Sequence, residues 1–158
     1  MKSNFFLFSI MLVLFFSACN NGIVYEENKE IPNASFNKGT ELNYEFNITD
    51  TLSSYDVLLK VEHGQEYGYQ NLYVKIKTVF PDAKSIEDIV SLELSKSGTE
   101  WQGKCNGDDC TVPIVLVENT KFKTPGKYQI SISQYGRTET VEGLNAFTLV
   151  VKKVEKEK

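Results

Sequence analysis

Residues 42–48 read Leu-Asn-Tyr-Glu-Phe-Asn-Ile, so a large apolar side chain stands at every second position. Successive side chains of a β-strand point to opposite faces, and this alternation is therefore typical of a strand with one buried and one solvated face. The same period of two returns at residues 57–61, 72–80, 128–132 and 147–151. Residues 112–117 form a continuous apolar run broken by Pro113, which indicates a buried or edge strand.

Turn sequences separate these runs, among them Asn37-Lys38-Gly39, Pro81-Asp82 and Pro125-Gly126. About eight short strands at this spacing predict an all-β fold, an antiparallel β-sandwich of the immunoglobulin-like or jelly-roll-like kind. Residues 85–94 fit a short helix nearly as well as a strand, and we favour the strand. Residues 23–31 are either a first edge strand or an extended arm. We place the sandwich at 41–152, after a tether and candidate first strand at 19–40, and a charged tail at 153–158.

The composition bounds the class of protein. A chain of 158 residues, 41% of them hydrophobic, suits one folded domain and argues against disorder. The formal net charge of -4 provides no basic footprint, so we expect no nucleic-acid partner. The chain has one histidine, which excludes any site that needs two imidazoles.

The N-terminus carries an export signal at residues 1–18. Lys2 precedes an apolar run at residues 5–16, followed by the small residues Ser17 and Ala18. Twelve helical residues rise about 18 Å, too short for a hydrocarbon core of roughly 30 Å. Residues 16–19, Phe-Ser-Ala-Cys, resemble a bacterial lipobox. The cysteine of such a motif, here Cys19, is lipidated with acyl chains such as palmitate and becomes the new N-terminus. The alternative is ordinary signal cleavage with an unrelated cysteine nearby.

Two further cysteines, Cys105 and Cys110, flank the turn sequence Asn-Gly-Asp-Asp. In an oxidising compartment a disulfide across so short a loop contributes roughly 2 kcal/mol. The alternatives are two free thiols, or a metal held by both thiolates with Asp108 or Asp109, although no further Cys or His cluster completes such a ligand set. We expect the disulfide and no metal.

No catalytic constellation stands out. His63 lies before Gly64 at a strand end, with no Gly-x-Ser-x-Gly context, and we expect an exposed turn histidine. Adjacent acids such as Glu87 and Asp88 point to opposite faces of a strand, which argues against a paired-carboxylate site. We therefore expect no enzyme activity and no cofactor.

Two groups of residues remain as candidate surface sites. The aromatic side chains of Tyr67, Tyr69, Tyr73 and Trp101 form either a face that binds sugars or a protein, or ordinary core and rim packing. Asp50-Thr51-Leu52 resembles the Asp-Ser/Thr-apolar motif of periplasmic O-glycosylation in Bacteroidetes-type bacteria, which makes Thr51 a candidate glycosylation site.

A family resemblance joins several segments. Their order after the lipobox is similar to that in the gliding-motility lipoproteins of Bacteroidetes, the GldH type, and they lie at residues 24–27, 69–73, 78–82, 101–104, 125–128 and 137–138. The resemblance implies a non-enzymatic lipoprotein of the outer membrane, on its periplasmic face or at the cell surface. Its implied partners are envelope proteins of the motility and type IX secretion machinery.

Cys19 alone carries over as a functional position. Cys105 and Cys110 replace part of a Gly-rich stretch of the family, so the cysteine pair is a local addition. The alternative function is a carbohydrate-binding surface lipoprotein that uses the tyrosine and tryptophan face.

Overall fold

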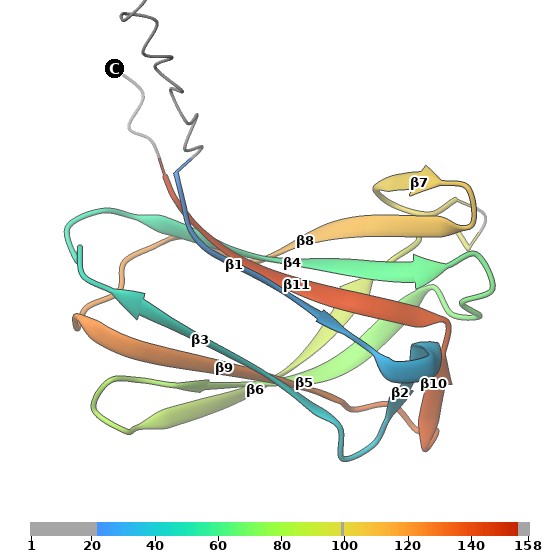
Figure 1. Ribbon diagram of the computed structural model, residues 1–158, viewed down its shortest axis with the longest axis horizontal. Helices are drawn as coiled ribbons and strands as arrows, with labels where there is room; N and C mark the ends of the chain where they lie inside the picture. Colours follow the sequence, from blue (N-terminus) through green and yellow to red (C-terminus); the bar gives the residue numbers. More distant parts are fainter. Residues whose placement is uncertain (1–21, 99, 155–158) are drawn as a thin grey trace, which may run out of the picture.

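The computed structural model describes residues 22–98 and 100–154, and these form two antiparallel β-sheets stacked face to face (Figure 1). One sheet has the strand order β1-β11-β4-β8-β7 and the other β3-β9-β5-β6, while β2 and β10 form a separate pair. The long strands are β1 (Ile23–Glu30), β3 (Glu41–Ile48), β4 (Tyr55–Gly64), β5 (Asn71–Val79), β6 (Ser85–Glu93), β8 (Asp109–Thr120), β9 (Gly126–Gln134) and β11 (Leu144–Lys153). The short elements are β2 (Ser35–Asn37), β7 (Lys104–Asn106), β10 (Thr140–Glu142) and the 3-10 turn η1 (Pro32–Ala34).

The connectivity is that of a jelly roll. Each long strand crosses to the opposite sheet from its predecessor, except β6, which forms a hairpin with β5. We predicted an immunoglobulin-like or a jelly-roll-like sandwich, and this order of eight strands in two packed sheets is that of the jelly roll. The predicted antiparallel sandwich is thus confirmed.

The core lies between the two sheets and follows the period of two. On β3 the buried side chains alternate strictly with exposed ones, and on β4 with partly exposed ones. The hydroxyl of Tyr44, which is buried in the centre, donates a hydrogen bond of 2.9 Å to the carbonyl of Phe147 on the facing sheet. A buried phenol needs such a partner, so this bond fixes the two layers against each other.

The structure decides the segments with more than one interpretation. Residues 85–93 form a strand, as we favoured, and residues 23–30 form an edge strand against β11. Pro113 lies in β8, whose outer edge is paired only over its first three residues by β7. An open edge is where a strand accommodates proline, because no neighbouring strand needs its missing N–H.

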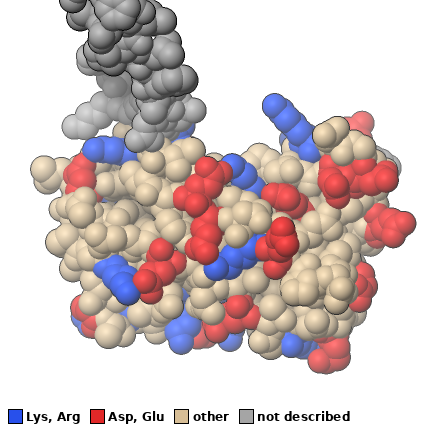
Figure 2. Space-filling view, viewed as in Figure 1, with Lys and Arg blue, Asp and Glu red and all other residues tan. Residues whose placement is uncertain are grey.

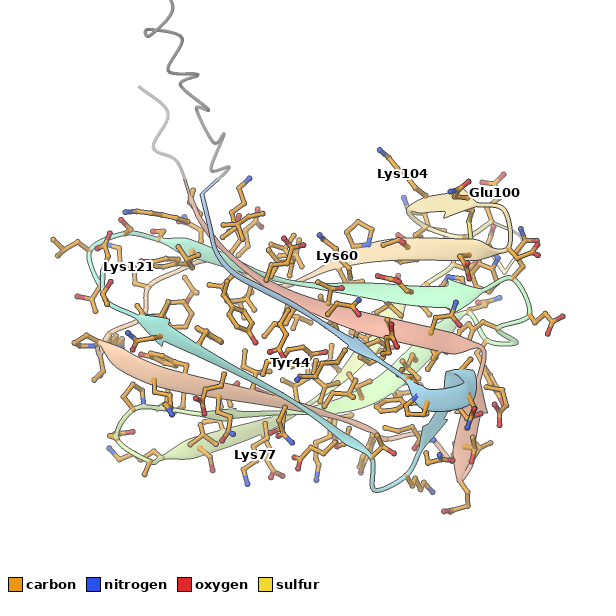
Figure 3. The ribbon with its side chains drawn as sticks, viewed as in Figure 1. Tyr44, Lys60, Lys77, Glu100, Lys104 and Lys121 are labelled. Carbon is orange, nitrogen blue, oxygen red and sulfur yellow. A yellow bond between two sulfur atoms is a disulfide. The ribbon has the colours of Figure 1, made fainter. Side chains whose placement is uncertain are left out.

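The sandwich has two distinct ends. Ile23 pairs with Lys152, so both chain ends leave from the same end of the molecule (Figure 1). We call this end the terminal pole, made of residues 22–24, 49–54, 80–84, 119–125 and 152–154. The opposite end, the distal pole, consists of the loops at 64–70 and 94–103 and of the β7–β8 hairpin. Lys121 lies at the terminal pole, and Glu100 and Lys104 at the distal pole (Figure 3).

On the face drawn in Figure 2, acidic side chains are spread along the whole length of the sandwich, with lysines between them. Within the described residues, no helix has the length and apolar character of a membrane span.

Candidate binding site

A cleft of about 370 Å³ opens at the distal pole between two loops. We call it the aromatic cleft; it is lined by Tyr67, Gly68, Tyr69, Gln70, Ser95, Gly98, Glu100 and Trp101. Three of the four aromatic residues predicted as a binding face therefore meet here, although Trp101 is 32 positions or more from the tyrosines in sequence. A mixed aromatic and polar lining suits a ligand with both apolar and hydrogen-bonding groups.

Backbone hydrogen bonds join the two loops. The carbonyl of Gln70 accepts the N–H groups of Leu94 at 2.9 Å and Ser95 at 3.0 Å. The hydroxyl of Ser95 donates to the carbonyl of Glu100 at 2.7 Å and accepts the N–H of Gly98 at 3.0 Å. The second loop is thus closed on itself by one serine side chain and attached to the first by one carbonyl.

The aromatic side chains divide into a buried support and an exposed surface. Tyr67 is only 3% exposed, packs against Tyr69 with ring centroids 5.7 Å apart, and donates its hydroxyl hydrogen to the carbonyl of Asn71 at 3.0 Å. Burial raises the pKa of Tyr67, so the phenol stays neutral. Tyr69 is 50% exposed, and Trp101 is half-buried beside it. Tyr69 therefore presents the accessible ring, with Tyr67 as its support.

His63 corrects a prediction. We expected an exposed turn histidine, but the side chain is fully buried, with its ring centroid 4.4 Å from that of Trp101. His63 stands in phase with the inward-facing Val57, Leu59 and Val61 of β4, and the strand continues through it to Gly64. The period of two was the sequence signal for this burial, and the following glycine obscured it.

The hydrogen bonding of His63 is one-sided. Its Nδ1 lies 2.8 Å from the carbonyl of Gly64, which requires Nδ1 to carry the hydrogen. Among the described residues, Nε2 has no hydrogen-bond partner. Burial lowers the pKa of His63, and the imidazole is therefore neutral. A buried, neutral ring that packs on Trp101 supports the floor of the aromatic cleft.

Tyr73 lies apart from the other three aromatic residues. It follows the inward-facing Leu72 on β5 and points to the outer face of that sheet, where it is 48% exposed. Its carbonyl accepts the N–H of Tyr135, a second exposed tyrosine that the sequence did not single out. Strand alternation separates Tyr73 from the cleft, because its side chain points to the outer face of the sheet and Tyr73 is absent from the cleft lining.

Cys105 and Cys110 form a disulfide across the β7–β8 hairpin, where they are directly paired residues. The structure thus contains the predicted bridge in place of free thiols or a thiolate metal site. The carboxylate of Asp109 accepts a hydrogen bond from Asn145 at 2.7 Å, and the carbonyl of Gly107 accepts one from Gln65 at 2.7 Å. The hairpin is therefore attached to the loop that carries Tyr67 and Tyr69. Within residues 22–98 and 100–154, no three His, Cys, Asp or Glu side chains group as metal ligands.

The remaining predicted positions concern the terminal pole. Thr51 is half-buried in the loop at residues 49–54 and lies far from the aromatic cleft. The carboxylate of the neighbouring Asp50 accepts several hydrogen bonds, the strongest influence being Lys153 at 2.6 Å. These bonds keep the pKa of the Asp50 carboxyl well below its usual range. Cys19 and the export signal lie outside the described residues.

Solved structures resemble this chain only loosely. A family GH115 4-O-methyl-alpha-glucuronidase has a TM-score of 0.45 at 12% identity, covering 84% of this chain and 18% of that one. A carbohydrate-binding module specific for non-crystalline cellulose has a TM-score of 0.42 at 10% identity, covering 81% of this chain and 72% of that one. At these scores the likenesses assign neither a function nor a ligand.

Sequence comparison is more informative. A protein of Christiangramia forsetii, named gliding motility lipoprotein GldH homolog, is 30% identical over 161 residues, which cover 99% of this chain and 98% of its own. The family model of the GldH lipoprotein matches residues 23–151, which is nearly the whole sandwich. The resemblance drawn from the ordered segments is thus confirmed, and this chain belongs to the GldH lipoprotein family.

Proposed function

We propose that the protein is a lipid-anchored envelope protein that acts, without catalysis, as an accessory or interaction subunit of the motility and type IX secretion machinery. The observation that carries this proposal is the match to a family of gliding-motility lipoproteins over residues 23–151. The lipobox at residues 16–19 adds the anchor, and Cys19 would hold the chain at the outer membrane, on its periplasmic face or at the cell surface. Burial of the chain's one histidine supports a role without catalysis, since His63 is withdrawn from solvent.

The mechanism we propose is tethering. Acyl chains confine the domain to one surface, which raises its effective concentration for any partner on that surface. Strand β4 runs from the terminal pole to the distal pole over ten residues, which places the aromatic cleft about 30 Å from the anchored end. A partner would thus meet the exposed ring of Tyr69 at the end of the domain that points away from the lipid.

Affinity purification of the tagged, lipidated protein from gently solubilised native membranes tests the proposal, with partners identified by mass spectrometry. We expect stoichiometric recovery of other motility or secretion envelope proteins, and loss of that recovery with Tyr69→Ala. Tyr73→Ala is the matched control, because it removes an equally exposed tyrosine from a different surface. A bait that returns alone under conditions that keep envelope complexes intact contradicts the accessory role.

A carbohydrate-binding lipoprotein is the second candidate, and one observation favours it. Tyr67, Tyr69 and Trp101 surround a single cleft together with the polar side chains of Gln70 and Glu100. Sugars stack on aromatic rings and exchange hydrogen bonds with such neighbours. A glycan-array signal that Tyr69→Ala abolishes and Tyr73→Ala preserves would establish this function, whereas an array without signal removes it.

A further inference from the structure

The terminal pole is held close to the site of the proposed lipid anchor. Gly22 is only three positions after Cys19, and so short a segment spans at most about 10 Å. Gly22 is itself fixed to the sandwich, because its carbonyl accepts the N–H of Lys153 at 2.7 Å. A cleft of about 580 Å³ joins Gly22 to Leu52 and Lys121 on one surface. If Cys19 is embedded in a bilayer, this surface lies against the headgroups.

Leu52 stands out on that surface because its side chain is 85% exposed. The loop that carries it is ordered by Asp50, whose Oδ1 accepts the N–H groups of Leu52 at 2.9 Å and Ser53 at 3.2 Å. The other carboxylate oxygen, Oδ2, accepts Lys153 Nζ at 2.6 Å, and Tyr55 donates its hydroxyl hydrogen to the Asp50 carbonyl at 2.6 Å. The turn therefore holds a largely exposed apolar side chain at a fixed place on this surface.

Two lysines, Lys121 and Lys153, line the same cleft as this exposed leucine. The terminal pole carries five lysines against two aspartates, in a chain whose formal net charge is -4; they are Lys84, Lys121, Lys123, Lys152 and Lys153 against Asp50 and Asp82. Lys84 and Lys153 pair with the two aspartates. Within the described residues, Lys121 and Lys123 have no carboxylate partner within 4.0 Å.

The loop that carries Lys121 and Lys123 is also fixed. The ring of Phe122 between them packs edge-on against Tyr55 at 5.3 Å and Tyr128 at 4.7 Å. Because Phe122 points into the core, the lysines on either side of it remain outside, and both are exposed. The lysine charges are thus presented by a rigid loop on the same end of the molecule as Leu52.

We propose that the terminal pole seats on an anionic lipid bilayer, with Leu52 entering the interface and Lys121 and Lys123 contacting the headgroup phosphates. This inference rests on the proposed lipidation of Cys19. Interfacial binding combines buried apolar area with attraction to anionic lipids, and these are the two features that the pole displays. Seating fixes the orientation of the domain and directs the aromatic cleft away from the membrane.

Glycosylation of Thr51 would give the exposed loop a different role. Thr51 is adjacent to Leu52, and a glycan there would hold the loop off the lipid. The two uses of the loop exclude each other, so an intact mass of the native protein belongs to the test.

The experiment uses the full lipidated chain in vesicles that contain phosphatidylglycerol and a lipid-borne quencher. A fluorophore is attached at Leu52→Cys, and in a matched protein at Glu139→Cys, an exposed position at the other end. We expect several-fold stronger quenching at position 52 than at position 139. Each lysine near an anionic surface is worth roughly fivefold in the contact equilibrium, so Lys121→Gln with Lys123→Gln should weaken contact roughly 25-fold. Lys75→Gln with Lys77→Gln, on β5, is the matched control and should leave the quenching unchanged.

The outcomes separate the seating from the anchor. Flotation with vesicles after a high-salt wash reports the anchor, and failure to float contradicts the proposed function itself. A protein that floats but shows equal quenching at positions 52 and 139 overturns the seating while the anchor stands. A native intact mass with a glycan at Thr51 overturns it as well.

Discussion

At the scale of single residues, His63 is the least conventional element of this protein. It occupies a core position of β4, packs on Trp101, and keeps Nε2 without a partner among the described residues. The folded state accepts such a buried imidazole only in its neutral form, because protonation would place a charge in the core. The stability of the domain is therefore linked to pH.

The sign of this linkage follows from the depressed pKa of His63. The unfolded histidine takes up a proton near pH 6.5, whereas the folded one does so only at a lower pH. The free energy of unfolding should consequently fall as pH decreases from 7 through 6.5 toward the folded pKa, by up to about 1.4 kcal/mol per pH unit. Urea unfolding between pH 7 and 5 measures this slope. His63→Phe should flatten the curve, since the chain has no other histidine, and a flat wild-type curve would contradict the burial.

At the scale of elements, the β7–β8 hairpin depends on close backbone approach. Gly103 has φ +92, and a Cβ there would lie 2.1 Å from the carbonyl oxygen of Thr111. Gly107 also has a positive φ, +66, but no atom lies within 4 Å of its Cβ position. A comparison of Gly107 with Gly103 therefore separates the cost of left-handed backbone from the cost of a steric clash with a neighbouring atom.

We predict that Gly107→Ala lowers the free energy of unfolding by about 1 kcal/mol, the cost of left-handed backbone for a residue with a Cβ. Gly103→Ala should lose a further 1–3 kcal/mol, roughly the cost of overpacking, since the Thr111 backbone must move. Urea unfolding of both variants measures the difference. Equal losses would show that the approach of Gly103 to Thr111 is not tight.

The disulfide in the same hairpin yields a second prediction at this scale. Closing a ring of six residues should contribute about 2 kcal/mol. A reductant should lower the unfolding free energy of the wild type by that amount and leave Cys105→Ala unchanged. If thiol titration of the oxidised, native protein finds both cysteines free, the bridge is absent in solution.

At the scale of the whole molecule, Cys19 is the one covalent membrane anchor that we propose, next to the end of the sandwich from which both chain ends leave. Cys19→Ser should therefore move the protein from the membrane pellet to the soluble fraction, because each lost methylene removes about 0.8 kcal/mol of membrane affinity. Cys105→Ala should stay in the pellet, as it alters a cysteine of the distal pole. Fractionation of cells that express each variant distinguishes these outcomes, and retention of Cys19→Ser in the pellet after a carbonate wash would contradict lipidation at this residue.

The sequence by itself determined the strands that alternate clearly, as residues 42–48 do, together with the sandwich class and the family, because strand alternation and ordered motifs are local patterns. It also marked Cys105 and Cys110 as a bridge across a turn. Only the tertiary structure decided which residues meet. Trp101 joins Tyr67 and Tyr69 because the register of two sheets brings separate loops to one end, while Tyr73 is turned to another face by the alternation of its own strand. That Leu52 and Gly22 line the same cleft is likewise a consequence of long-range strand pairing, which no local pattern encodes.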